Sequence, residues 1–145
     1  MLNLKDFKMK IVVCGSMSSA AKMIEVKKSL KSLSHKVVLP SNTEDYASKK
    51  IILEGSGESP ERKIKFDLTR EYYNEINNAE AVLIVNIDKN EVKNYIGGSA
   101  FMELSFGHVL NKKLFLLNPI PSMIYTDEII ALQPTILNGD LSKIK

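Results

Sequence analysis

The chain has 145 residues, of which 44% are hydrophobic and 26% are charged, and its formal net charge is +3. These values are typical of one globular domain with enough apolar side chains for a proper core. The single cysteine, Cys14, excludes an intrachain disulfide and a thiolate metal cluster, and two histidines are too few for most zinc sites.

No apolar run in the sequence is long enough to cross a bilayer, and residues 1–10 lack the apolar core of a signal peptide. We therefore expect a cytoplasmic protein that needs neither a metal nor a cofactor.

The densest basic cluster lies on a predicted helix without interleaved aromatic residues, as is typical of a solvated helix face. Its members are Lys22, Lys27, Lys28 and Lys31. We expect neither a nucleic-acid partner nor a membrane partner.

Short apolar runs alternate along the chain with stretches of helical spacing. The predicted elements are a strand at 10–14, a helix from about 19 to 33, a strand at 36–40, a helix at 68–79, a strand at 81–86, a helix from 99 to 110, a strand at 113–117, a short helix at 127–132 and an edge strand at 134–137. Proline ends the second strand and begins the last one, which suits an edge position.

Residues 41–65 interrupt this alternation. The segment contains Gly55-Ser56-Gly57, Pro60 and many charges, and its one strong apolar cluster is at 51–53. We expect a long, partly helical and mobile excursion. Such excursions often form lids or binding loops, and a plain surface loop is the alternative.

Five strands that alternate with helices predict one α/β domain spanning 1–145, with a five-stranded parallel sheet and helices on both faces. The predicted strand order is 2-1-3-4-5, the flavodoxin-like, Rossmann-like arrangement. In that order a ligand crevice lies between strands one and three, beyond their carboxyl ends. Three segments should meet there: residues 15–19, residues 86–99 and Asn118-Pro119.

The turn after the first strand is a candidate anion site. Gly15 and Ser16 precede a helix, and glycine allows close approach of a ligand to backbone N–H groups. Together with Met17 and Ser18, this turn could hold a phosphate or a carboxylate. It is neither a Walker loop nor a dinucleotide fingerprint, and an ordinary turn with a serine cap is the alternative.

Glu103 is the main candidate for chemistry. Gly97-Gly98-Ser99 opens its helix, and helical spacing places Phe106, Gly107 and Leu110 on the same side as the glutamate. A carboxylate on an apolar face either reaches toward the crevice or has a raised pKa, and near a helix N-terminus it could act as a nucleophile or base. The alternative is a helix-capping glutamate. Gly107 should let the helix approach the sheet closely.

Several other residues near the predicted crevice could have either a functional or a structural role. Asp88 could bind a ribose hydroxyl or begin a turn, and Asn118 lies where the fourth strand ends. Tyr72 and Tyr73 could line the pocket or pack in the core. For Cys14 the core reading is preferred to a nucleophilic role.

Three segments of the chain resemble the nucleoside 2-deoxyribosyltransferase superfamily, which includes the 2'-deoxynucleoside 5'-monophosphate N-glycosidases. They are Cys14-Gly15-Ser16, residues 78–85 (NAEAVLIV) and residues 98–113 (GSAFMELSFGHVLNKK). The most specific part is Met102-Glu103-Leu104 with Gly107.

The resemblance implies that Glu103 attacks the anomeric carbon and forms a glycosyl-enzyme intermediate. It also implies that Gly15 and Ser16 contact the 5' end of the sugar, with Gly98 and Ser99 assisting near the glutamate. The family's base-assisting aspartate falls on Tyr72, and Gly97 stands where the transferases carry an acidic residue. Tyr72, Tyr73 and Asp88 are therefore the candidates for assisting the base.

The leading hypothesis is cleavage or transfer of the N-glycosidic bond of a nucleoside or nucleoside 5'-monophosphate. One alternative is a non-catalytic nucleotide-binding or sensing module of the same fold. Another is a phosphoribohydrolase of the cytokinin-activating type, whose Pro-Gly-Gly-x-Gly-Thr run is only partly matched by residues 96–99. The apolar side chains of Leu104, Phe106 and Val109 predict a homodimer or larger homo-oligomer.

Overall fold

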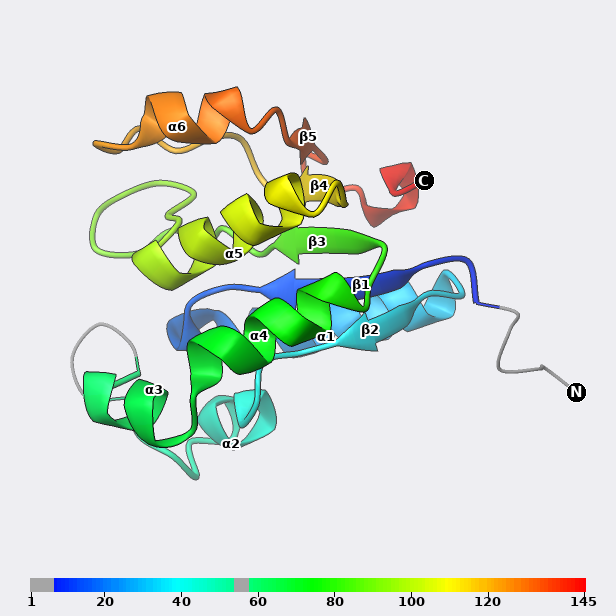
Figure 1. Ribbon diagram of the computed structural model, residues 1–145. Coiled ribbons are helices and arrows are strands. Elements are labelled where there is room, and N and C mark those ends of the chain that lie inside the picture. The colour runs from blue at the N-terminus through cyan, green and yellow to red at the C-terminus, as the bar shows by residue number, and fades with distance from the viewer. Residues whose placement is uncertain (1–6, 54–57) are drawn as a thin grey trace, which may run out of the picture.

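The computed structural model describes residues 7–53 and 58–145 (Figure 1). Within these residues, five strands form one parallel sheet in the order β2-β1-β3-β4-β5, which confirms the predicted topology. The strands are β1 (Lys10–Cys14), β2 (Lys36–Val38), β3 (Ala81–Ile84), β4 (Lys113–Leu116) and β5 (Thr135–Ile136). The helices are α1 (Ala20–Ser32), α2 (Thr43–Ala47), α3 (Pro60–Lys65), α4 (Leu68–Asn77), α5 (Gly98–Val109) and α6 (Thr126–Ala131), with 3₁₀ turns η1 (Met17–Ser19) and η2 (Leu141–Lys143).

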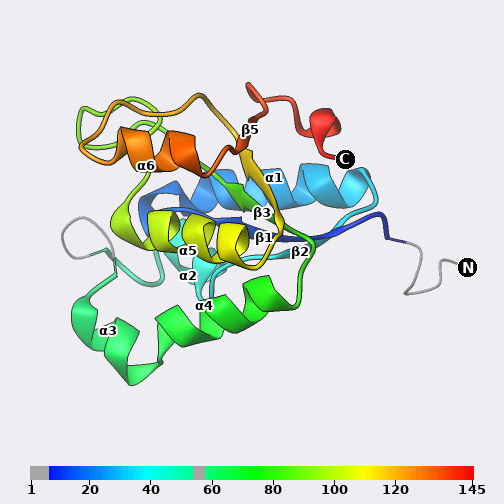
Figure 2. The same cartoon turned by 45° about the horizontal axis from the view of Figure 1, so that its top comes forward.

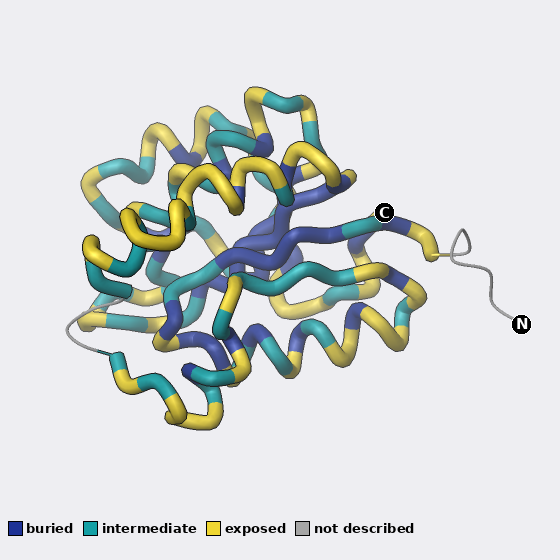
Figure 3. Tube along the Cα trace, turned by 60° about the horizontal axis from the view of Figure 1, so that its bottom comes forward, coloured by how far each residue is buried: buried dark blue, intermediate teal, exposed yellow. Residues whose placement is uncertain are grey.

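The central strands β1, β3 and β4 are apolar apart from the lysine that begins β1 and β4, because both faces of the sheet are covered. Side chains alternate between the faces. In β1, Ile11 and Val13 join the core cluster under α1, whereas Val12 and Cys14 join the cluster under α4, α5 and α6. Figure 3 shows these strands as the buried centre of the molecule. Cys14, the last residue of β1, thus faces α5, which carries Glu103.

Helices cover the sheet on both sides. α1 contributes Met23 and Leu30 to one core cluster, and α5 lies between α4 and α6 on the opposite face (Figures 1 and 2). Gly107 sets the distance of α5 from the sheet, since a Cβ atom there would lie 2.7 Å from Leu114 Cδ2 and 2.8 Å from Val82 Cγ2. The predicted close approach at Gly107 is confirmed.

The excursion at 41–65 is partly helical, as predicted, in its described residues. α2 is tied to the core through Tyr46, which is buried in the cluster under α1. α3 has no buried residue and exposes Ile64 to 80%. The predicted Gly55-Ser56-Gly57 turn lies outside the described residues.

The carboxyl ends of the strands define one end of the molecule. Figure 1 shows the start of α5, the loop that follows β3, and α3 together at that end. No helix in the described ranges is both long enough and apolar enough to span a membrane.

Candidate functional site

A cavity of about 270 Å³ opens beyond the carboxyl ends of β1 and β3, where the crevice was predicted. It lies between the turn after β1, the loop after β3, the first turns of α4 and α5, and α3. Its lining comprises Gly15, Ser16, Met17, Pro40, Ser41, Glu58, Lys63, Leu68, Thr69, Glu71, Tyr72, Lys89, Tyr95, Gly97, Gly98, Ser99, Ala100, Met102, Glu103 and Phe106.

Gly15 and Ser16 form one wall of the cavity. A Cβ atom on Gly15 would lie 3.0 Å from Ser19 Oγ and 3.2 Å from the Val85 carbonyl oxygen, so the tight turn leaves little room for a side chain. Ser16 caps η1, its hydroxyl accepting from the Ser18 backbone N–H at 3.4 Å. The turn is therefore compact, and the Ser18 and Ser19 backbone N–H groups are bonded within it, to Ser16 Oγ and to the Ser16 carbonyl oxygen.

Lys89 brings a cation to this wall. Its Nζ atom donates a hydrogen bond to Ser16 Oγ at 2.6 Å and lies 5.5 Å from the centre of the Tyr95 ring. Burial lowers the pKa of the Lys89 ammonium from its ordinary value. The structure thus pairs a lysine from the loop after β3 with the serine turn after β1.

Glu103 lies in the second turn of α5 and is half-buried in the cavity wall. Burial raises the pKa of its carboxyl to about 7, from an ordinary 4.5. A hydrogen bond with the Cys14 thiol and the charge of Lys63 act in the opposite direction, whereas the charge of Glu58 adds to the rise. At neutral pH the carboxyl is therefore divided between its ionised and protonated forms.

Cys14 and Tyr72 lie behind Glu103. Both are buried, and burial raises the pKa of the thiol and of the phenol well above their ordinary values. The Tyr72 hydroxyl donates a hydrogen bond to the Val13 carbonyl oxygen. Tyr72 therefore lines the cavity as a neutral phenol whose proton is already engaged by the backbone.

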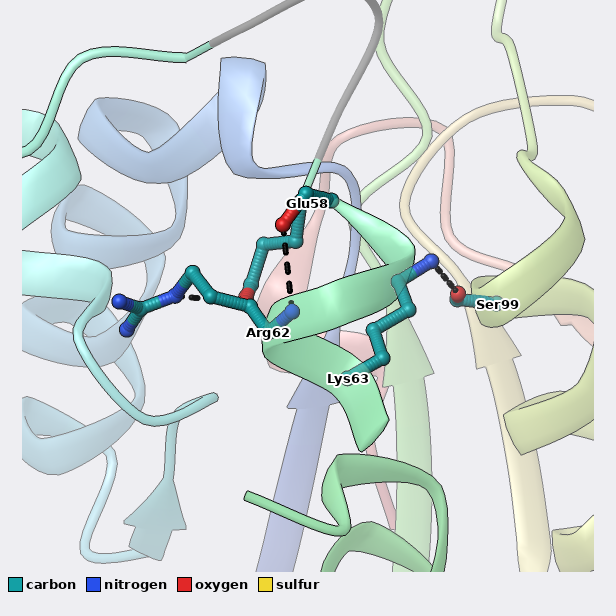
Figure 4. Close-up of polar contacts among 5 residues, drawn as sticks. Glu58, Arg62, Lys63 and Ser99 are labelled. Atoms are coloured by element: carbon teal, nitrogen blue, oxygen red, sulfur yellow. Dashed lines mark hydrogen bonds and ion pairs between the residues drawn. The ribbon is translucent and has the colours of Figure 1, made fainter. Parts of the chain in front are cut away.

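α3 and the residues before it form another wall of the cavity, through Lys63 and Glu58. Lys63 Nζ donates a hydrogen bond to Ser99 Oγ at 3.0 Å, which links α3 to the first turn of α5 (Figure 4). Glu58 pairs with Arg62 at 3.5 Å between Oε2 and Nε. This wall carries charges of both signs next to Glu103.

The structure brings together most of the residues predicted for the site. Gly15, Ser16, Met17, Tyr72, Gly98, Ser99 and Glu103 all line the cavity. Three predicted binding residues are not part of this lining. Ser18 is exposed and its hydroxyl lies 3.0 Å from Ser16 Oγ.

The side chains of Asp88 and Asn118 both form hydrogen bonds with the backbone around the cavity. Asp88 Oδ1 accepts from the Asn94 backbone N–H at 2.9 Å and shapes the loop that carries Lys89. The Asn118 backbone N–H donates to Asn86 Oδ1 at 2.9 Å, and its side-chain amide donates to the Asn86 carbonyl oxygen at 3.0 Å. These bonds join the chain after β3 to the chain after β4.

Sequence reasoning did not single out Glu58, Lys63, Lys89 or Tyr95. The loop at 86–99 was predicted to reach the crevice, so Lys89 could have been found as the first lysine after β3. Glu58 and Lys63 lie in the excursion, where no periodic pattern indicates which side chains face inward. Within the described residues, no group of three or more His, Cys, Asp or Glu side chains could hold a metal ion.

A scan against models of protein families found no match for this chain, and a search of curated proteins found no match either.

Proposed function

We propose that the protein cleaves or transfers the N-glycosidic bond of a nucleoside or nucleoside 5'-monophosphate, with Glu103 as the nucleophile. The observation that supports this proposal most is the placement of Glu103. Its carboxyl lines a cavity at the carboxyl end of a parallel sheet and has a pKa of about 7. Such a group can be ionised for attack under physiological conditions.

In the proposed first step, a Glu103 carboxylate oxygen forms a bond to the anomeric carbon while the bond from that carbon to the base nitrogen breaks. The bonding electrons leave with the base, which takes up a proton. In the second step, water or an acceptor base displaces Glu103 and frees the enzyme. Glu58 and Glu71 also line the cavity and are candidates for protonating the base.

The wall that holds Lys89 suits the 5' end of the substrate. A cation 2.6 Å from Ser16 Oγ, at the start of the η1–α1 segment, offers charge and N–H donors to a phosphate. We therefore propose a preference for 5'-monophosphates over nucleosides. Lys89→Met should abolish this preference and leave nucleoside turnover nearly unchanged.

One observation favours the alternative of a nucleotide-binding module without turnover. Tyr72 occupies the position where the resembled family assists the base, and its hydroxyl already donates to the Val13 carbonyl oxygen. In that case the cavity would hold a nucleotide without cleaving it.

The deciding experiment measures release of free base from a panel of nucleosides and 5'-monophosphates by chromatography. Addition of a second base distinguishes transfer from hydrolysis. Glu103→Gln, purified in parallel, controls for contaminating activity. Base release by the wild type and its loss in the variant would support the proposal, whereas ligand binding by calorimetry without base release would support the binding module.

Self-association is also proposed. Leu104 is fully buried and belongs to the core, so this part of the sequence argument for an apolar surface is corrected. Met102 and Tyr73 are nevertheless exposed, and the Tyr73 ring meets Phe106 edge-on with centroids 5.4 Å apart. We propose a homodimer or larger assembly through this face. Sedimentation at micromolar concentration that shows only monomer would overturn it.

A further inference from the structure

Lys63 is held close to Glu103 by the fold. Its ammonium donates to Ser99 Oγ at 3.0 Å (Figure 4). Lys63, Ser99 and Glu103 all line the same cavity. Ser99 and Glu103 are four residues apart in α5, so they lie on one face of the helix, with about 5–6 Å between Cβ atoms. Helical side chains lean toward the N-terminus, which directs Glu103 toward Ser99 and its bound ammonium.

The position of this lysine is electrostatically unfavourable for α5 alone. Backbone N–H groups at a helix N-terminus carry partial positive charge and repel a cation. Lys63 is nevertheless hydrogen-bonded to the first turn of α5. The charge of Lys63 also lowers the pKa of the Glu103 carboxyl, against the effect of burial.

The helix that carries Lys63 is anchored independently of the lysine. Ser59 caps α3 by accepting from the Arg62 backbone N–H at 3.2 Å, and the Arg62 side chain pairs with Glu58 and lies beside Tyr46. Tyr46 is buried in the core. Replacing Lys63 should therefore leave α3 in place.

Several other groups with charge or a titratable proton surround Glu103. From β1 comes Cys14, from α4 come Tyr72 and Glu71, and from the segment before α3 comes Glu58. Lys89 and Tyr95 line the cavity from the loop after β3. Burial and the charge of Glu58 oppose the ionised carboxylate, whereas the Cys14 hydrogen bond and the charge of Lys63 favour it.

We propose that Lys63 is a positioning residue for Glu103: α3 holds its ammonium on Ser99, one helical turn away, where it stabilises the ionised carboxylate. An excursion outside the five-stranded core thereby extends to lower pH the range in which Glu103 is a nucleophile. The effect of Lys63 on turnover rests on the proposed function, whereas the effect of Lys63 on the ionisation of Glu103 does not.

The test is a ¹³C NMR titration of the Glu103 side-chain carboxyl in the full-length protein. The Glu103 resonance is assigned by its absence in Glu103→Gln. In Lys63→Met the midpoint should rise by about one pH unit, because an opposite charge at this range favours the ionised form. Lys63→Arg should restore most of the shift, since it keeps the charge.

The matched control is Lys65→Met. Lys65 is exposed on the same short helix, is absent from the cavity lining, and lies over the Phe66 ring. Its replacement removes an equal charge and should leave the Glu103 midpoint unchanged. Circular dichroism checks folding, and Lys63→Gln replaces Lys63→Met if the latter does not fold.

An unchanged Glu103 midpoint in a folded Lys63→Met or Lys63→Gln variant would overturn the role of Lys63. An equal shift in Lys65→Met would overturn it too, since it would indicate a general charge effect. A midpoint shift without any base release would support the role and count against the proposed function. If base release occurs, the acidic limb of kcat/KM should move to higher pH with the midpoint, and a fixed limb would contradict the inference.

Discussion

The two walls of the cavity that meet at Glu103 are built in different ways. α5 packs tightly on the sheet and buries Ala100, Leu104 and Gly107, whereas α3 buries none of its residues. α5 is thus held by apolar packing, and α3 by a serine cap and an ion pair. The Glu58–Arg62 pair is largely buried, so loss of hydration offsets much of its Coulombic gain, whereas apolar burial stabilises without that cost.

This difference separates two tasks. Glu103, the reacting group of the proposed reaction, lies on the tightly packed α5. The charged side chains that affect its ionisation lie on or just before α3, which contributes little to the core. Because α3 contributes little to the core, substitutions there should alter the chemistry of Glu103 more than they alter folding. Substitutions on the α5 wall should affect both.

The largest expected effect follows from loss of the Glu103 carboxyl. Glu103→Ala should lower base release by about a thousandfold or more, because no other group takes over the covalent step. Ligand binding measured by calorimetry should persist. Glu128→Ala, an exposed substitution on α6, is the control for an unspecific loss of charge. Near-normal turnover of folded Glu103→Ala would show that the glutamate has only a structural role.

Glu103→Gln should stabilise the fold in a pH-dependent way. The folded-state pKa of about 7 lies above the ordinary 4.5, so the folded wild type holds this proton more tightly than the unfolded chain. The stability gained from that proton is complete below about pH 4.5 and is lost as pH rises through 7. At pH 8 the variant should therefore be more stable than wild type by up to about 3 kcal/mol.

Urea unfolding at pH 4 and at pH 8 measures this difference. The stability gain should be near zero at pH 4, where the carboxyl of the wild type is protonated in both states. A gain of equal size at both pH values would indicate that hydrogen bonding or packing, rather than ionisation of Glu103, is responsible.

Gly107→Ala should break the close packing of the α5 wall. The new methyl group would lie within 2.8 Å of side-chain atoms of both Val82 and Leu114, and overpacking of this kind costs about 1–3 kcal/mol. Gly98→Ala is a matched control in the same helix, because a Cβ atom there meets nothing within 4 Å. Urea unfolding should show a lower midpoint for Gly107→Ala than for Gly98→Ala, and equal midpoints would contradict the account of Gly107.

The smallest expected effect on global stability is at the α3 cap. Ser59→Ala removes the acceptor for the Arg62 backbone N–H, which should weaken α3 by about 1 kcal/mol. Global unfolding in urea should change by less than this, since α3 has no buried residue. Hydrogen exchange should instead accelerate at residues 62–66 and not in α5. A full loss of about 1 kcal/mol in global stability would show that α3 unfolds together with the core.

The sheet and the location of the cavity could both be predicted from the amino-acid sequence. The apolar runs of β1, β3 and β4 are buried on both faces, and such strands have few alternatives to the centre of a parallel sheet. Strand order and short crossovers then place Gly15, Ser16 and Glu103 at one end. The spacing of Gly107 from Glu103 also indicated which side of α5 approaches the sheet.

Which polar side chains meet at that end depends on how the chain packs in three dimensions. Lys63 and Lys89 come from segments without apolar periodicity, so no local pattern indicates where their long, flexible side chains point. Tyr72 turns its hydroxyl to the Val13 carbonyl oxygen, and Asn118 is engaged with Asn86, because buried polar groups bond the nearest backbone partner. Such contacts join residues far apart in sequence, and they form only when the packed backbone has brought both partners within hydrogen-bonding distance.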